Sequence, residues 1–216
     1  MKEFYEEFNL LFNNITSNKA PGLTLEEISA YLTKGEYYVE DLIYSEYEKS
    51  EEARKKLSDL IRTKRYVTET SDASLVKYND ELSHVYPLDD EVRYIVNELI
   101  KYKDTAAGCD RGKIASVSPV IHDEVNRVIK NPFRFNTDRT LRLDISHKGK
   151  RCSEILSLVP QIEYYQVRYV KTAEPIVLTD DVFSSGGTQE VCELNEILHR
   201  QVVEVAAQFA AQDYKS

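Results

Sequence analysis

The sequence contains no tryptophan, a single methionine and only three cysteines in 216 residues. The cysteines, Cys109, Cys152 and Cys192, lie far apart and form no Cys-x-x-Cys pair. An odd, widely spaced set argues against a disulfide framework and against a structural zinc site, so we expect three free thiols. The four histidines include no pair four residues apart, which leaves little material for a metal site. We therefore predict no metal site and no cofactor.

Long apolar runs are missing as well. No stretch approaches the roughly 18 consecutive apolar residues that a membrane-spanning helix needs. Residues 1–7 are acidic and lack the hydrophobic region of a secretory signal. With 42% hydrophobic and 30% charged residues, the chain can bury a core and keep a polar surface. We expect a protein that is made in a cytoplasm and has no membrane partner.

Positive charge is in deficit, because 28 Lys and Arg stand against 37 Asp and Glu. The formal charge of −9 makes the chain a poor general binder of nucleic acid. The signs are also segregated: residues 111–171 carry 12 basic and 6 acidic side chains, and residues 172–216 carry 2 and 8. This pattern favours contacts between neighbouring copies, basic face against acidic face, although chance clustering gives similar patterns in many domains.

Tyrosine, by contrast, is abundant at 15 residues. Its large apolar body and polar tip suit protein interfaces. The same properties suit half-exposed positions on strands and helices, so both explanations stay open.

Helical periodicity marks the N-terminal part of the chain. Residues 2–15 have one apolar stripe, and we predict a helix there. Thr24 and Glu27 form a capping-box pattern that begins a helical region at 24–63. We expect an αα-hairpin or a broken long helix in that region, with Gly35 as a local weak point.

Short runs rich in Val, Ile and Tyr follow, separated by turn residues. They predict strands at 92–100, 113–118, 139–145, 155–159 and 162–170, with 175–178 ending the β region. A short helix is inserted before Asn131-Pro132, and residues 194–213 form a final helix.

The order of these elements predicts an α+β chain. Its parts are an N-terminal helical hairpin, a small antiparallel sheet or sandwich with an inserted helix, and a C-terminal helix. We place a helical arm at 1–66 and an α+β domain at 67–216, or both within one compact unit.

Four patterns carry residue types that catalysis or binding uses. The segment 108–113 has glycines at the wrong spacing for a phosphate-binding loop, and a strand rather than a helix follows it. Cys109 has no local signature of a nucleophile and is better explained as a loop thiol.

The other two patterns are carboxylate-rich. The pair at 180–181 lies beside a glycine-rich segment and could hold a cation, although a solvated turn explains it better. In His122-Asp123-Glu124 adjacent side chains point in different directions, and Asp123 or Glu124 suits a helix N-terminus. We predict no catalytic, cofactor-binding or metal-binding residues and no enzyme.

A series of short motifs runs in a fixed order across residues 24–212. Those of the β region are Tyr86-Pro-Leu-Asp-Asp, Val92-Arg-Tyr-Ile-Val-Asn-Glu, Val117-Ser-Pro-Val-Ile-His-Asp-Glu, Asn131-Pro-Phe-Arg and Arg139-Thr-Leu-Arg-Leu-Asp. Those after it are Tyr164-Tyr-Gln-Val-Arg-Tyr-Val-Lys, Glu174-Pro-Ile-Val-Leu and Glu193-Leu-Asn-Glu-Ile-Leu-His-Arg-Gln-Val-Val-Glu-Val-Ala-Ala. Those before it are Ile28-Ser-Ala-Tyr-Leu-Thr and Tyr47-Glu-Lys, with Glu52, Arg54 and Leu57 after them. Together they resemble the ring proteins that build the tail barrel of crAss-like phages of gut Bacteroides. The chain departs from that pattern at Gly35 and at 184–187.

The resemblance implies a structural virion protein of a short-tailed phage. Its copies would form a homo-oligomeric ring, a dodecamer, in the portal-proximal tail barrel, and enclose a channel for ejection of the genome and cargo proteins. The implied partners are adjacent tail ring proteins, the portal or other tail components, and DNA or cargo proteins in transient, non-specific contact with the lumen. The implied location is the virion tail, after assembly in the host bacterial cytoplasm.

Two other classes of function stay open from the residues alone. One is a small soluble adaptor or regulatory domain with no virion role. The other is an enzyme whose site lacks a recognised motif, which would require a polar cluster in a deep pocket.

Overall fold

The structure is a computed structural model that describes residues 2–17, 19–70, 72, 74–105, 111–179 and 192–215. The helices are α1 (Lys2–Ile15), α2 (Leu25–Ser45), α3 (Glu51–Lys56), the short 3₁₀ helix η1 (Ser58–Leu60), α4 (Val125–Ile129) and α5 (Glu196–Lys215). The strands are β1 (Ile61–Tyr66), β2 (Ser83–Pro87), β3 (Val92–Tyr102), β4 (Ile114–Pro119), β5 (Arg139–His147), β6 (Lys150–Leu156) and β7 (Ile162–Lys171). The predicted α+β class is confirmed.

The chain divides into two compact units. The helical unit comprises residues 1–60 and 172–216, and the sheet unit comprises residues 61–171. This grouping differs from the boundary that we expected between residues 66 and 67. Residues 61–66 are the first strand of the sheet, and the C-terminal helix packs on the N-terminal helices α1 and α2. That the units fold independently of each other stays a prediction.

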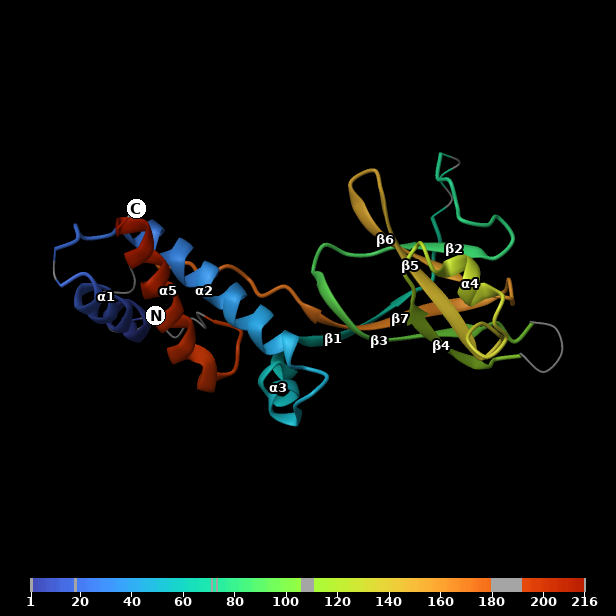
Figure 1. Cartoon of the computed structure of the whole chain (residues 1–216), viewed down its shortest axis with the longest axis horizontal. Coiled ribbons are helices and arrows are strands. Elements are labelled where there is room, and N and C mark those ends of the chain that lie inside the picture. The colour runs from blue at the N-terminus through green and yellow to red at the C-terminus, as the bar shows by residue number, and fades with distance from the viewer. Residues whose placement is uncertain are drawn as a thin grey trace. The chain divides into compact units, whose positions relative to one another are not determined.

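Helix α5 is the centre of the helical unit and packs on both α1 and α2 (Figure 1). The apolar stripe of α1 buries Phe4, Phe8 and Phe12, and α5 buries a stripe that includes Leu198 and Val202. Because these side chains recur every three or four residues, each helix covers one face of its neighbour. The predicted helices at 2–15 and 194–213 are therefore confirmed, and α1 packs on its own unit.

Helix α2 begins at a capping box, as the sequence predicted. The Thr24 hydroxyl accepts a hydrogen bond from the Glu27 backbone N–H (3.2 Å), and the Glu27 carboxylate accepts one from the Thr24 N–H (2.8 Å). The helix then continues without interruption through Gly35, so the expected weak point at this glycine was wrong. A Cβ at Gly35 would lie 2.8 Å from the carbonyl oxygen of Val202 in α5. At Gly35 the two helices therefore lie too close together to leave room for a side chain.

We had expected residues 175–178 to end the β region. The extended segment after β7 instead belongs to the helical unit. The Ile176 N–H donates to Thr33 Oγ1 (3.0 Å), and the Leu178 N–H donates to Ser29 Oγ (2.9 Å). Hydroxyl groups on the surface of α2 thus replace a neighbouring strand as hydrogen-bond partners for this backbone.

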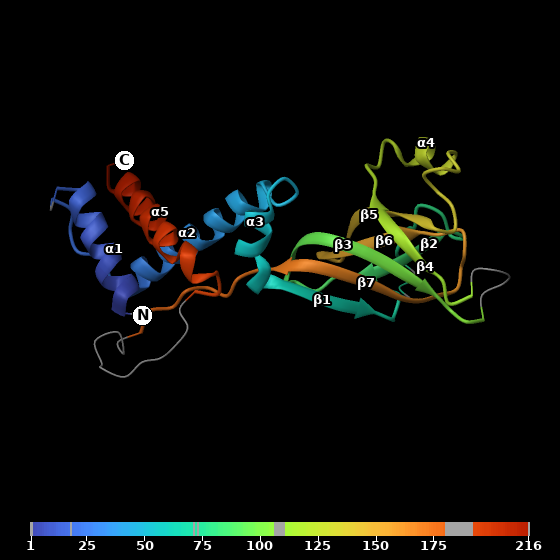
Figure 2. The ribbon, with the colours of Figure 1, turned by 90° about the horizontal axis from the view of Figure 1, so that it is seen from below.

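The sheet unit contains one seven-stranded curled sheet with the order β1-β7-β3-β4-β5-β6-β2. Every neighbouring pair is antiparallel except β4 and β5, which are parallel. A parallel pair needs a crossover connection, and residues 120–138, which include α4, supply it (Figure 2). We call residues 120–138 the crossover segment. The expected antiparallel sheet is thus confirmed as a mostly antiparallel one, whereas our expectation of helix at 61–63 was wrong, because β1 begins at Ile61.

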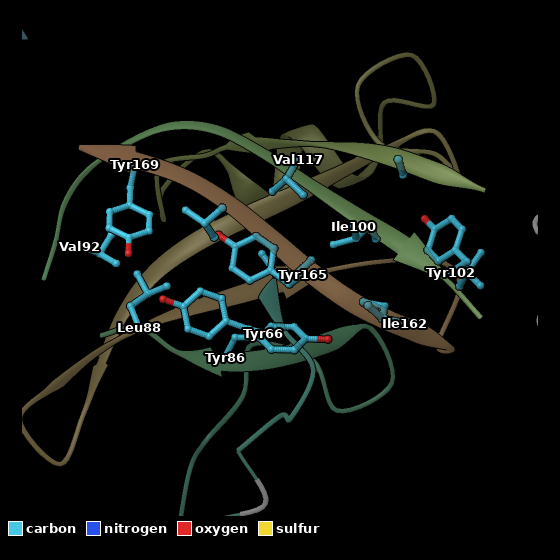
Figure 3. Close-up of a cluster of buried hydrophobic side chains, with 14 residues drawn as sticks. Tyr66, Tyr86, Leu88, Val92, Ile100, Tyr102, Val117, Ile162, Tyr165 and Tyr169 are labelled. Carbon is cyan, nitrogen blue, oxygen red and sulfur yellow. The ribbon is translucent and has the colours of Figure 1, made fainter. Parts of the chain in front are cut away.

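Aromatic side chains fill the concave interior of the curled sheet (Figure 3). The Tyr165 ring on β7 lies 6.0 Å from the Tyr66 ring on β1 and 5.3 Å from the Tyr86 ring on β2. The three rings therefore join the edge strand β2 to β1 and β7 at the opposite side of the sheet. Tyr102 and Tyr169 are buried in the same cluster, so part of the tyrosine content serves this core.

The close approach of α2 and α5 makes Gly35→Ala a test of helix packing. The new methyl group would meet a backbone carbonyl, and such overpacking costs about 1–3 kcal/mol, more than the roughly 1 kcal/mol that alanine contributes to helix stability. We expect a lower free energy of unfolding in urea. Gly22→Ala is the matched control, because a Cβ at Gly22 meets nothing within 4 Å and should leave stability unchanged or slightly higher. Equal stability of both variants would contradict the packing argument.

The sheet unit is one continuous segment with its own buried cluster, so residues 61–171 should fold when expressed alone. The expected result is a dispersed amide NMR spectrum and a cooperative thermal transition. A collapsed spectrum, with the full chain folded under the same conditions, would refute independent folding.

Candidate assembly surfaces

The phosphate-loop-like segment has no phosphate-binding geometry where the structure describes it. Gly112 lies in a turn with φ +59°, and Lys113 leads directly into strand β4. A phosphate site of that type needs backbone N–H groups at the start of a helix. Cys109 and the carboxylates at 180–181 lie outside the described residues.

His122, Asp123 and Glu124 are on the surface of the crossover segment and do not converge. His122 Nε2 lies 2.9 Å from the Asp144 carbonyl oxygen. The Glu124 carboxylate accepts a hydrogen bond from Arg127 (2.6 Å) and makes no cap to α4. We had expected Asp123 or Glu124 to cap the N-terminus of this helix. The Glu124 side chain makes no such hydrogen bond. Within the described ranges, no three His, Cys, Asp or Glu side chains are grouped as metal ligands would be.

Two of the three cysteines are described, and both are free thiols in buried positions, Cys152 and Cys192. The Cys192 thiol donates to Glu36 Oε1 (3.1 Å), and burial together with this carboxylate raises its pKa well above the ordinary range. A buried thiol with a raised pKa is a poor nucleophile.

A charged cluster lies inside the sheet unit. Arg142 Nη1 on β5 donates to Glu98 Oε2 on β3 (2.7 Å), and the Tyr165 hydroxyl donates to Glu98 Oε1. The Tyr165 oxygen also lies 3.2 Å from Ser153 Oγ. Glu98 is 6% exposed and Tyr165 is fully buried, so a substrate cannot reach the carboxylate.

The titration of the cluster follows from its burial. Burial raises the pKa of the Glu98 carboxyl, and the neighbouring Arg142 and Tyr165 only partly offset that effect. Burial and the Glu98 charge raise the pKa of Tyr165 as well. Because the cluster is internal and its charged groups pair with each other, we assign it to structure. Sequence reasoning missed it because Glu98, Arg142 and Tyr165 come from three strands.

Charge on the molecule is divided between the two units. The helical unit carries 9 Lys and Arg against 21 Asp and Glu, a formal charge of −12. The sheet unit carries 19 against 16, a formal charge of +3. The two units thus keep opposite formal signs, although the positive excess falls from +6 in residues 111–171 to +3 in the whole sheet unit.

Both edges of the sheet are protected against pairing with a further strand. The edge strand β1 exposes the cationic Arg62, Lys64 and Arg65, which disfavour edge-to-edge pairing. At the other edge, the Thr70 N–H donates to the Val85 carbonyl oxygen of β2 (2.8 Å). Contacts between copies are thus expected away from the sheet edges.

The crossover segment carries the most exposed aromatic side chain of the sheet unit. Phe133 is 81% exposed, and Ile121 in the same segment is 68% exposed. A cavity of about 390 Å³ is lined by Ile121 and also by Val120, Arg134 and Arg139. Exposed apolar residues next to arginines are typical of protein interfaces. The sequence signal for this surface was an aromatic residue directly after Asn131-Pro132.

The corner between α2 and α3 forms a second hollow, in the helical unit. We call it the corner pocket; its cavity is about 200 Å³. Its apolar lining comes from Leu42, Ile43 and Ala53, and its polar lining from Glu46, Ser50, Glu52, Lys56 and, on α5, Gln201. Lys56 pairs with Glu52 (2.9 Å), so Glu46 supplies the carboxylate that is left for a partner. Leu42 is 46% exposed there.

Comparison with known proteins links the chain to phage tails. A sequence-family model described as phage tail ring protein 3/4 matches residues 1–216. The chain is 33% identical to Ring protein 3 of Bacteroides phage crAss001, over 97% of this chain and 94% of that protein. It is also 28% identical to Ring protein 4/5 of the same phage, over 100% of this chain and 93% of that protein. No helix in the described part of the chain is long and apolar enough to cross a membrane.

The internal ion pair predicts a large effect for Arg142→Met. Removing the cation leaves the buried Glu98 carboxylate without its partner, which costs about 3–5 kcal/mol in the free energy of unfolding. Urea denaturation measures the loss, and adding Glu98→Leu should recover much of it because no buried charge then remains. Asp144→Asn is the control, since Asp144 is 56% exposed and its contact with Arg142 should contribute little. An Arg142→Met variant as stable as Asp144→Asn would contradict the structural role.

Proposed function

Since the chain belongs to the phage tail ring protein 3/4 family, we propose that its copies close into a ring in the portal-proximal tail barrel of a short-tailed phage. The coarser statement follows from the family alone: the chain is a structural ring protein of a phage tail. The proposal adds a dodecamer, with adjacent ring proteins and the portal or other tail components as partners.

The division of charge supports the ring. A ring that closes by rotation uses a heterologous interface, in which each subunit presents two different surfaces. The helical unit at −12 and the sheet unit at +3 supply two surfaces of opposite sign. Electrostatic complementarity of this kind selects partners and increases association rates.

The channel role rests on charge as well. We propose that the lumen lets the genome and cargo proteins pass during ejection. An acidic chain makes few attractive contacts with phosphate, so DNA would meet it only in transient and non-specific contacts. The proposed ring performs no chemistry, and its location is the virion tail after assembly in the host cytoplasm.

The adaptor alternative is less well supported. An adaptor that shares only a fold with ring proteins would match them over part of its length. Here the family match and both relatives extend over nearly the whole chain.

The ring is tested by native mass spectrometry and negative-stain imaging of the purified protein, and by cryo-EM of the parent particle. We expect a closed oligomer or density for this chain in the tail. A stable monomer that is missing from particles would overturn the proposal and favour an adaptor.

Assembly should also weaken with salt. The proposed contacts join surfaces of opposite sign. Raising NaCl from about 0.05 M to 0.5 M shortens the electrostatic screening length from above 10 Å to below 8 Å. The sedimentation coefficient should therefore shift toward that of the monomer. Circular dichroism should stay constant and serves as the folding control. Assembly that grows stronger with salt would point to an apolar interface instead.

A further inference from the structure

Phe133 is held in an exposed position by a hydrogen-bonded turn. The Phe133 N–H donates to Asn131 Oδ1 (3.0 Å), and the Phe133 carbonyl oxygen accepts from Arg139 Nη1 (3.0 Å). The Asn136 side chain donates to the Pro132 carbonyl oxygen (2.8 Å). The backbone of this turn is therefore fixed on both sides of the aromatic residue.

Phe135, two residues after Phe133, anchors the same turn in the core. Phe135 is 3% exposed, and its N–H donates to the Asn131 carbonyl oxygen (2.9 Å). Two phenylalanines two residues apart thus have opposite environments. An aromatic side chain that is presented rigidly to solvent loses little conformational entropy on binding, which is the property of an interface anchor.

The surroundings of Phe133 are cationic. Lys130 and Arg134 are exposed beside it, and neither side chain makes an ion pair or a hydrogen bond within the described residues. Of the three acidic residues in the crossover segment, Asp123 is exposed, Glu124 is held by Arg127 (2.6 Å) and Asp138 by Lys113 (2.6 Å). The turn therefore presents an apolar ring with unpaired positive charge around it.

The corner pocket has the complementary properties. It is a partly open hollow of about 200 Å³ with both apolar and polar walls, large enough to receive an aromatic ring. Leu42, Ile43 and Ala53 provide apolar contact, and the exposed Glu46 side chain makes no ion pair or hydrogen bond in the described part of the chain.

The pocket is also preformed. The Arg54 guanidinium donates to the carbonyl oxygens of Tyr47 (3.0 Å) and Glu48 (2.9 Å), which closes the connection between α2 and α3. The Ser50 hydroxyl accepts from the Ala53 N–H (3.3 Å) and caps α3. Binding there requires no refolding of the corner.

We propose that Phe133 of one subunit inserts into the corner pocket of a second copy of this chain, with Arg134 paired to Glu46. The proposal rests on the proposed ring, because it names the residues of the contact between copies. Phe133 belongs to the sheet unit and the corner pocket to the helical unit. Each subunit therefore inserts its Phe133 into one neighbour and binds the Phe133 of another neighbour in its own pocket. This is the heterologous arrangement that a closed ring requires.

Sedimentation velocity over a concentration series tests the contact. Phe133→Ser should weaken self-association by at least about 30-fold, the loss expected for an aromatic hot spot. Val67→Ser is the matched control, because Val67 is also in the sheet unit and 70% exposed but lies outside the turn. Both variants should melt at the wild-type temperature, since both side chains are in solvent.

Exchanging the charges of Arg134 and Glu46 tests whether these two residues pair across the contact. Arg134→Glu and Glu46→Lys should each weaken association, and an equimolar mixture of the two variants should associate more strongly than either alone. Unchanged association of Phe133→Ser, or mixed variants no stronger than the single ones, would overturn the contact while leaving the ring possible through other surfaces. A wild-type chain that stays monomeric at high concentration but is present in virion tails would overturn this contact alone. Absence from the tails would overturn the proposed function itself.

Discussion

The ion pair between Glu98 and Arg142 is the constraint on which the sheet depends most. Strands β3 and β5 are separated by β4, so the pair spans a strand and fixes the distance between its neighbours. An unpaired charge in this interior would be expensive, and the curvature that brings Arg142 to Glu98 is therefore strongly favoured over flatter arrangements. The Tyr165 hydroxyl extends the network to β7, and the tyrosine rings pack around it.

Local signals in the sequence predicted much of the fold. The capping box at Thr24, the stripe of α1 and the β-branched runs of β3 and β7 each encode their structure within a few residues. β1 was missed because its six residues include four exposed ones, so no apolar alternation marks it. Tertiary pairing determines this strand, through its register with β7.

Other features depend on contacts between distant segments. The packing of α5 on α2 brings Val202 to Gly35, and no local pattern relates these positions. The parallel pairing of β4 and β5 likewise follows from the path of the crossover segment. The assembly surfaces were only partly visible: charge segregation appears in the sequence, whereas the exposure of Phe133 and the burial of Phe135 are properties of the folded turn.

The chain passes from the helical unit into the sheet unit at β1 and returns at β7, and these two strands pair with each other. Ile61, at the start of β1, is opposite Val170, near the end of β7. The ends of residues 61–171 are therefore neighbours, as in a cassette inserted at one point of a host chain. A genetic exchange with breakpoints near these two residues replaces the whole sheet and preserves the packing of α1, α2 and α5. Related phages thus have a simple route to vary one surface of a ring subunit independently of the other.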